Sequence, residues 1–400
     1  MTFVKRGFFR RSGEETIMKR IEPDKEYLIK VRRELHKIPE VGFNLPKTVA
    51  FIKGELDKLG IEYTERYGKS SIVGYIAKGR GKVVALRADI DALPVKEETG
   101  LPFASTHEGM MHACGHDTHA AMLLTTAKML KEVEAELTCE VRLFFQAAEE
   151  YAPGGAKLMC EDGCMEGVDT VIGAHIDPEI PFGMIGLNYG CMSASSHGFF
   201  LDFYGRSSHV ATPHKGVDAI AMACRAYMDI QTMRARECDP MSPIIIGIGE
   251  FHGGAANNVV CDHVHWHGTI RTTSNENDDF VYRRIGEIAK ATAEDMGGRA
   301  EITTTKHYPS IINDPATAKM IVEAASEVLG ADMVNDKKEY MMGGEDFAFY
   351  LLHGKGAFFH IGMRSDRYTF APWHNGKFFV DEDALVTGPA VMYEFVRRYK

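Results

Sequence analysis

The sequence predicts an α/β protein in which a small domain is inserted into a larger, discontinuous one. In residues 24–195, and again after Pro309, short β-branched runs alternate with segments of helical periodicity, as they do in an α/β sheet. Between these parts the order becomes strand, helix, strand, strand, helix, strand, which is the ferredoxin-like βαββαβ pattern. We therefore expect a mixed-sheet domain built from residues 20–195 and 310–400, with a βαββαβ domain at 196–309.

The N-terminal part is expected to begin with two helices joined by a turn. Apolar residues recur at helical spacing through residues 24–60, and Gly60 ends the second run. The strands that follow are short, apolar and β-branched, as buried strands tend to be, and a helix at Thr118–Val133 separates the first two from the later two. The expected strands are Ile72–Ile76, Val83–Leu86, Val141–Phe145 and Thr170–Ile172.

The inserted segment is expected to fold as a four-stranded antiparallel sheet with both helices on one face. Its expected elements are the strand Gly198–Tyr204, the helix Val217–Arg236, the strands Pro243–Phe251 and His263–Arg271, the helix Glu276–Met296 and the strand Ala300–Lys306. The larger domain then resumes with the helix Ala316–Leu329, the strand Ala357–Ile361 and the closing helix Ala384–Tyr399.

Composition excludes two classes of partner. The chain has 46 Lys and Arg residues against 56 Asp and Glu residues, and a net charge of −10 repels the phosphates of nucleic acids. Every uninterrupted apolar run is far shorter than the about 20 residues that cross a bilayer. We expect neither nucleic acid nor membrane as a partner.

The cysteine pattern favours a reducing compartment. Eight cysteines are scattered over 400 residues, too sparsely for a disulfide-stapled secreted domain, and we expect a cytoplasmic protein. Cys160 and Cys164 have no second pair that would complete a structural zinc site. The basic segment 1–17 has no apolar core of a secretory signal, and Met18 is a plausible native start.

The densest group of metal-capable side chains lies between Gly109 and the helix expected near Asp117. It contains His112, Cys114, His116 and His119. The glycine between Cys114 and His116 lets the backbone bend, so that thiolate and imidazole can reach one ion. The alternative is a reduced buried cysteine beside histidines at a helix N-terminus.

Further candidates follow the strands of the predicted sheet. Glu149 and Glu150 come just after one strand, His175 ends another, and Asp89 and Asp91 end a third. In open α/β sheets, sites are built where parallel strands end. Two adjacent carboxylates can divide the work, one binding a cation and the other accepting a proton from water. Taken singly, the glutamate pair is more often a solvated loop and the histidine more often a core or surface residue, and only their convergence on one edge predicts a site.

A series of ordered motifs then resembles the M20 metallopeptidase superfamily over about residues 25–397. The motifs are Arg87–Pro94, Cys114–His119, Glu149–Glu150, Gly173–His175, His209 with Thr212–His214, Asn258–Val260, Gly268–Arg271, Gly344–Phe347 and Pro372–His374. More narrowly they resemble the amidohydrolase branch, which includes hippurate hydrolases, N-acyl-amino-acid deacylases and plant indoleacetyl-amino-acid hydrolases. The resemblance implies a metallohydrolase domain with an inserted lid and dimerisation domain, and a homodimer formed through the lid.

The resemblance also implies roles for individual residues. Two divalent ions per subunit, Zn, Mn, Co or Ni, would share Glu150 or Cys114, and Glu149 would be the general base. The implied metal ligands are Cys114, His116, Glu150, His175 and His374. Asp89, Asp91 and Asp117 would surround these ligands without binding the ions themselves.

The inserted domain would contribute to the reaction as well. His209 is the candidate donor for the oxyanion, and Arg271, assisted by Asn258, is the candidate for binding a substrate α-carboxylate. The implied reaction is hydrolysis of an N-acyl amino acid, a small molecule, to a carboxylic acid and a free amino acid. An aminopeptidase or dipeptidase, and a catalytically silent binding relative, are the alternatives.

The chain departs from the usual family pattern near the last ligand. The family usually has Leu-His-x-Pro there, whereas this chain has Trp373-His374-Asn375-Gly376, and Cys261 replaces a usual proline. These changes affect the expected acyl preference more than the chemistry, and Phe370 with Trp373 would suit a flat acyl group. His360 ends a strand and is the rival of His374 as a ligand.

Overall fold

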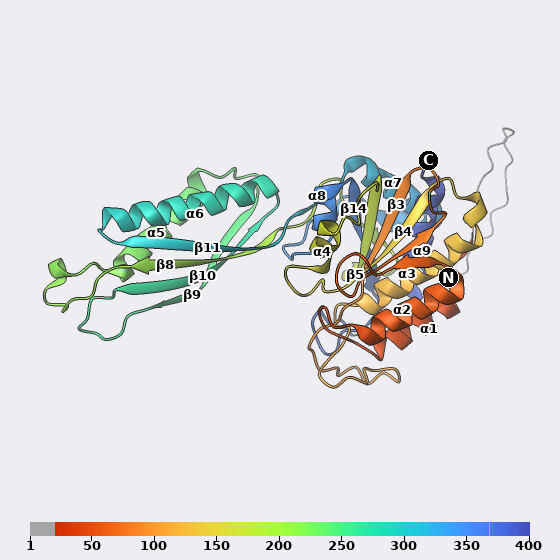
Figure 1. The fold of residues 1–400 in the computed structure, drawn as a ribbon, viewed down its shortest axis with the longest axis horizontal. Coiled ribbons are helices and arrows are strands. Elements are labelled where there is room, and N and C mark those ends of the chain that lie inside the picture. The colour runs from red at the N-terminus through yellow and green to blue at the C-terminus, as the bar shows by residue number, and fades with distance from the viewer. Residues whose placement is uncertain (1–20, 368) are drawn as a thin grey trace.

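The computed structural model describes residues 21–367 and 369–400, so the basic segment 1–17 and Met18 lie outside the described residues. Two bodies joined by a pair of linkers lie side by side along the long axis (Figure 1). Each body has its own hydrophobic core, and the two clusters share no residue. The predicted mixed α/β fold with an inserted βαββαβ unit is confirmed. The residue limits expected for the two domains stay a prediction.

The larger body, which we call the catalytic domain, is centred on an eight-stranded mixed sheet. In spatial order its strands are β1 (Glu62–Thr64), β2 (Ile72–Ile76), β4 (Glu140–Gln146), β3 (Val83–Asp89), β5 (Thr170–Pro181), β14 (Gly356–Arg364), β6 (Ile185–Gly186) and β13 (Val334–Asn335). The four central strands β4, β3, β5 and β14 run parallel, so their carboxyl ends meet at one edge. Two short strands, β7 (Cys191–Ser193) and β12 (Ile311–Ile312), pair separately beside the linkers.

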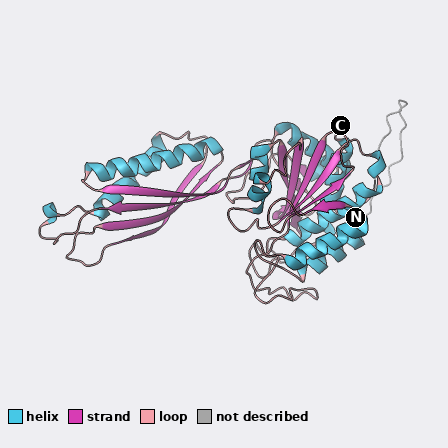
Figure 2. Cartoon of the chain, viewed as in Figure 1, coloured by secondary structure: helices cyan, strands magenta, loops and turns pink. Residues whose placement is uncertain are grey.

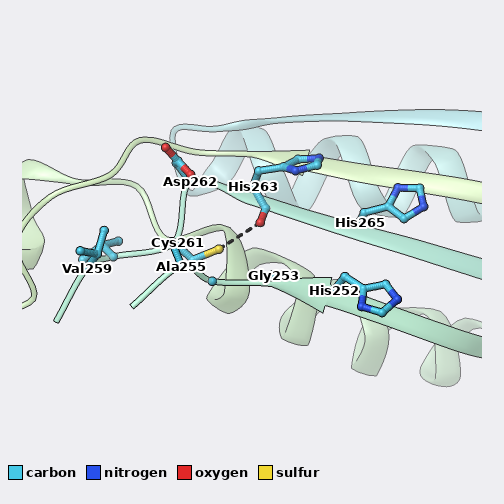
Figure 3. Close-up of a pocket in the computed structure, with 10 residues that line it drawn as sticks. His252, Gly253, Ala255, Val259, Cys261, Asp262, His263 and His265 are labelled. Carbon is cyan, nitrogen blue, oxygen red and sulfur yellow. Dashed lines mark hydrogen bonds between the residues drawn. The ribbon is translucent and has the colours of Figure 1, made fainter. Parts of the chain in front are cut away.

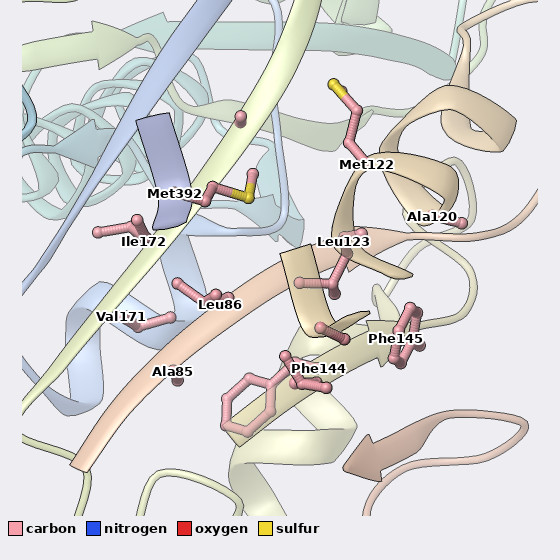
Figure 4. Packing of buried hydrophobic residues seen from close by; sticks show 14 of the residues in the cluster. Ala85, Leu86, Ala120, Met122, Leu123, Phe144, Phe145, Val171, Ile172 and Met392 are labelled. Atoms are coloured by element: carbon pink, nitrogen blue, oxygen red, sulfur yellow. The ribbon is translucent and has the colours of Figure 1, made fainter. Parts of the chain in front are cut away.

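Helices lie on both sides of this sheet (Figure 2). They are α1 (Lys25–His36), α2 (Pro46–Leu59), α3 (His116–Glu132), α4 (Gly155–Glu161), α7 (Pro315–Leu329), α8 (Ala348–His353) and α9 (Thr387–Arg398). Helix α3 is almost wholly buried because it packs between the sheet and the helices α1 and α9. Figure 4 shows the apolar contact, with Leu123 of α3 near Leu86 of β3 and Phe144 of β4. Among the described residues, no helix is long and apolar enough to span a bilayer.

The inserted body, which we call the lid, has the strand order β11, β8, β10, β9 expected for a split βαβ unit. Its elements are β8 (Ser196–Tyr204), α5 (Ala219–Arg236), β9 (Ile244–Gly253), β10 (His263–Thr272), α6 (Asn275–Asp295) and β11 (Arg299–Tyr308). All sheet neighbours are antiparallel. Both helices cover one face of the sheet (Figure 1), because Val264 and Trp266 of β10 are buried beneath them. The other face is open.

Several expected boundaries are wrong by a few residues. Helix α5 begins at Ala219 because the Asp218 carboxylate accepts hydrogen bonds from the next backbone amides and caps the helix. The closing helix begins at Thr387 after a 3₁₀ turn, and β5 continues to Pro181 because β14 pairs along its whole length. The short helices α4 and α8 were not expected, since a few apolar residues between glycines carry no periodicity to recognise.

Candidate metal centre

The carboxyl ends of the parallel strands collect the acidic and imidazole side chains in one place. Asp89 ends β3, Glu149 and Glu150 follow β4, and His175 lies in β5. Because β3 lies between β4 and β5, these residues come together from three adjacent strands. The sheet topology therefore explains why these residues meet although they are far apart in the sequence.

A glycine turn adds Cys114 and His116 to this edge. Gly115 lies between them with φ of 88°, in the left-handed region. A Cβ at this position would lie 2.3 Å from Cδ1 of Ile176, so only glycine fits. The turn directs the thiol and the first imidazole of α3 toward the same point.

Two groups of candidate ligands share the thiol. In the first, Sγ of Cys114 lies 3.3 Å from Nε2 of His175, and His116 completes the group. In the second, Cys114 lies with Glu150 and His374, whose Oε1 and Nε2 are 3.2 Å apart. Within each group the donor atoms lie within 4.8 Å of one another. The two groups therefore overlap at Cys114.

The chemistry of the donors fits divalent metal ions. Both ring nitrogens of His116 are buried and make no hydrogen bond among the described residues, and the nearest carboxylate oxygen to Nδ1 is that of Asp91 at 3.4 Å. The Nδ1–H of His175 donates to the Ile176 carbonyl at 2.6 Å, which leaves Nε2 as a lone-pair donor. Burial and the nearby carboxylate of Glu150 raise the pKa of the Cys114 thiol, so a thiolate forms there only beside a cation. Sulfur, nitrogen and oxygen donors together suit Zn, Mn, Co or Ni.

Glu149 stands next to these ligands but in a different environment. Its carboxylate lies close to His116 and Glu150 on one side and to Glu345 and Asp346 on the other. Burial, and then the negative charges of Glu345 and Glu150, raise its pKa well above the ordinary range. A carboxyl with a raised pKa is suited to accept and return a proton.

The three aspartates expected to support the site make distinct contacts. Asp91 accepts hydrogen bonds from the backbone amides of Glu149 and Glu150 at 3.0 and 3.2 Å, which fixes the loop that carries both carboxylates. Asp89 contacts Nδ1 of His119 at 2.5 Å. Asp117 accepts from Arg32 at 2.8 Å and contacts His36, and so anchors the start of α3.

The structure also reveals supporting residues to which sequence reasoning gave no role. Arg87 is buried at the centre of the sheet, and its guanidinium donates to Asp89, Glu345 and Asp346 at 2.7 to 3.0 Å. These bonds offset part of the negative charge of the acidic residues beside Glu149. Arg87, Glu345 and Asp346 lie in the family motifs Arg87–Pro94 and Gly344–Phe347, which could have drawn attention to them. A motif alone does not show which of its side chains pair.

His119 and Tyr308 are two further supports. Nε2 of His119 accepts from the Ile176 backbone amide at 3.0 Å, next to the ligand His175. The hydroxyl of Tyr308, at the end of the lid strand β11, donates to the Glu149 carbonyl at 2.5 Å. The lid therefore contacts the backbone of the candidate base directly.

His374 and its rival His360 occupy different positions. His374 reaches Glu150 with a φ of 61°, a left-handed conformation that is uncommon outside glycine and concentrates at functional sites. His360 lies one strand behind His175, with ring centroids 6.3 Å apart, and its Nδ1 is hydrogen-bonded to Asp177 at 2.8 Å. The structure thus groups His374, and not His360, with the other candidate ligands.

The candidate residues of the lid lie at opposite ends of its sheet within one chain. His209 and Asn258 lie in the loops beyond the end of β8 that is remote from the catalytic domain. Nine residues of β8 span roughly 30 Å. Arg271 lies at the opposite end of the sheet, beside the linkers, where Thr272 pairs with Ser195.

Comparison with known proteins agrees with this geometry. Residues 85–398 match the model of peptidase family M20/M25/M40. An N-acetyl-L-cysteine deacetylase of Bacillus subtilis is 37% identical over 93% of this chain and 88% of that protein. The IAA-amino acid hydrolase ILR1-like 4 of Arabidopsis thaliana is 33% identical over 94% of this chain and 86% of that protein. A solved Bacillus subtilis structure, a dinuclear metal binding peptidase from the M20 family, has a TM-score of 0.81 at 32% identity and covers 93% and 97% of the two chains.

Proposed function

The chain belongs to peptidase family M20/M25/M40, and from that membership we propose that it hydrolyses the amide bond of N-acyl amino acids with two divalent metal ions. The observation that carries the proposal is the pair of ligand groups that share Cys114, with the proton-accepting Glu149 beside them. The coarser statement, a metal-dependent amidohydrolase, follows from the family itself. The acyl group, the number of ions and the residue roles are the parts we propose.

The roles of the chain's own residues follow from their positions. The ligands of the proposed centre are Cys114, His116, Glu150, His175 and His374. When bound, the ions polarise the scissile carbonyl and lower the pKa of water toward neutrality. Glu149 removes a proton from the attacking water and returns it to the leaving nitrogen, and Asp91 keeps its backbone in place.

An N-acyl substrate is favoured over a substrate with a free amine. Such an amine needs an accessible acidic group, but Glu345 and Asp346 are buried and both contact Arg87. Arg271 is half-buried, and among the described residues no carboxylate pairs with it, so its guanidinium is available for the α-carboxylate of the substrate. Trp373 packs edge-on against His175, with ring centroids 5.5 Å apart, and we propose that it forms one wall for a flat acyl group.

A homodimer would complete the site. Nδ1 of His209 accepts a hydrogen bond from the Ala211 amide at 3.1 Å, so Nε2 carries the proton and can donate to an oxyanion. His209 is remote from the metal centre of its own chain, and a partner's lid would bring a second copy there. Strand β9 supports this arrangement because it is an unpaired edge with exposed Ile245 and Phe251.

A substrate panel tests the proposed function. We expect hydrolysis of N-acetyl, N-benzoyl, N-succinyl or N-indoleacetyl amino acids with added Mn, Co or Zn, and loss of activity with a chelator until metal is restored. Hydrolysis of dipeptides with a free amine alone would instead indicate an aminopeptidase or dipeptidase. Bound metal without hydrolysis of any compound would indicate a silent relative. We further propose a cytoplasmic location, because all eight cysteines are free thiols.

A further inference from the structure

The open face of the lid sheet carries a second concentration of histidines, which the proposed reaction does not use. His263, His265 and His267 alternate with buried residues along β10, so all three point away from the helices. His252 of β9 is the cross-strand partner of His265, and Asp202 of β8 is its partner on the other side. Figure 3 shows His252, His263 and His265 lining one pocket on this face.

The imidazoles of His263 and His265 contact one carboxylate, whereas His252 contacts Glu250 at 3.5 Å. Oδ1 of Asp202 lies 2.8 Å from Nε2 of His263 and 3.0 Å from Nδ1 of His265. Aromatic rings hold these imidazoles in place, since Tyr204 stacks on His263 and Phe200 stacks on His265. We call Asp202, His252, His263 and His265 the lid histidine cluster.

We infer that the lid histidine cluster binds a late first-row divalent transition metal such as Zn²⁺, separately from the catalytic centre. Two imidazoles and one carboxylate, with His252 as a further imidazole in the same pocket, are donor types that such ions prefer. Two imidazoles already approach the same carboxylate oxygen from two sides. An ion between them would take the place of the protons that these hydrogen bonds now use.

The environment permits the small movement that coordination requires. The side chains of His263, His265 and His252 are 48%, 33% and 70% exposed, so the rings can turn toward an ion without disturbing the core. The hydrogen bonds from His265 and His263 outweigh partial burial and lower the pKa of Asp202, which keeps the carboxylate ionised. The net charge of −10 also favours a cation at the surface.

Zinc counting on the purified holoenzyme tests the inference. The protein is dialysed against Zn²⁺, and bound metal per chain is measured by elemental analysis. We expect the wild type to bind one zinc more per chain than the double variant His263→Gln/His265→Gln. The single variant His265→Gln should weaken this additional zinc by at least about tenfold, the loss that follows even when a supporting group is removed.

The control is His353→Gln, an exposed histidine on the catalytic domain at the end of α8. It should bind as much zinc as the wild type. Equal zinc counts in the wild type and the double variant would overturn the inference. So would an equal loss in His353→Gln, which would show only scattered binding to surface imidazoles.

Discussion

The catalytic domain and the lid both gather histidines around carboxylates, but in opposite environments. His116 and His175 of the catalytic domain are buried, and His116 has no hydrogen-bond partner among the described residues. His263 and His265 of the lid are partly exposed, and both are hydrogen-bonded to Asp202. The buried His116 is therefore left without a hydrogen bond, whereas the exposed imidazoles of the lid each have one.

This difference determines how strongly each region should hold an ion. A buried polar group without a partner costs about 1–3 kcal/mol, and a bound ion removes that cost. The lid imidazoles lose their hydrogen bonds and part of their hydration when they bind an ion, so their net gain is smaller. We expect the catalytic centre to retain its ions through dialysis that empties the lid histidine cluster.

The largest expected effect comes from Glu149 of the catalytic domain. Its substitution should remove the proton acceptor and leave the metal ligands in place. Glu149→Gln keeps the shape and removes the proton acceptor, so turnover should fall by about 10²–10⁴-fold, or about 3–5 kcal/mol in the barrier. Metal content should hardly change. Steady-state kinetics with elemental analysis checks this, and Glu323→Gln on the exposed face of α7 is the control. Near-normal turnover in Glu149→Gln would show that the base is another residue.

The second prediction concerns the dependence of the catalytic domain on the lid. His209→Ala should reduce turnover by about 10²–10³-fold, the usual effect of losing one oxyanion donor, without loss of metal. Mixing this variant with Glu149→Gln under subunit exchange should restore part of the activity, because a mixed dimer holds one site with both residues intact. Light scattering establishes the oligomeric state. A fully active monomer would contradict the arrangement, and failure to complement despite proven exchange would place His209 outside the partner's site.

The third prediction distinguishes the two rival histidines at the edge of the sheet. His374→Ala should weaken metal binding by at least about tenfold, because it removes a member of the ligand group with Cys114 and Glu150. His360→Ala should have a smaller effect, since that imidazole is hydrogen-bonded to Asp177 behind the site. Metal titration of the two purified variants compares them. The reverse order of losses would make His360 the ligand.

Much of the fold follows from sequence because hydrophobic periodicity is local. The βαββαβ order of the lid and the alternating strands of the catalytic domain are visible as residue patterns, and both are found in the structure. The short elements α4, β6 and β13 are not predictable in this way, since neighbours distant in sequence stabilise them. The parallel pairing of β13 with β6, for example, involves residues 334–335 and 185–186.

The residues of the candidate site could be predicted from the sequence, but the hydrogen bonds and ion pairs between them could not. Strand-end positions indicated Glu149, Glu150 and His175, because each follows or ends an apolar run. The pairing of Arg87 with Glu345 and Asp346 spans more than 250 positions and depends on how the strands are ordered, which no local pattern specifies. The alternation of histidines along β10 was visible in the sequence, but the position of Asp202 beside them required the sheet register.

The smallest expected effect concerns Arg271, which lies where the two regions meet. Arg271→Lys keeps the positive charge but loses the planar pair of donors that matches a carboxylate, so KM should rise about tenfold while kcat changes less. The change should be seen with N-acyl amino acids and should disappear with the corresponding N-acyl amines, which have no α-carboxylate to bind. Arg283→Lys on the exposed side of α6, where the arginine pairs with Glu287, is the matched control and should leave KM unchanged. An equal rise in KM for the amines would show that Arg271 only shapes the hinge between the lid and the catalytic domain. A rise confined to the acids would show that the lid binds the end of the substrate whose amide bond the catalytic domain cleaves.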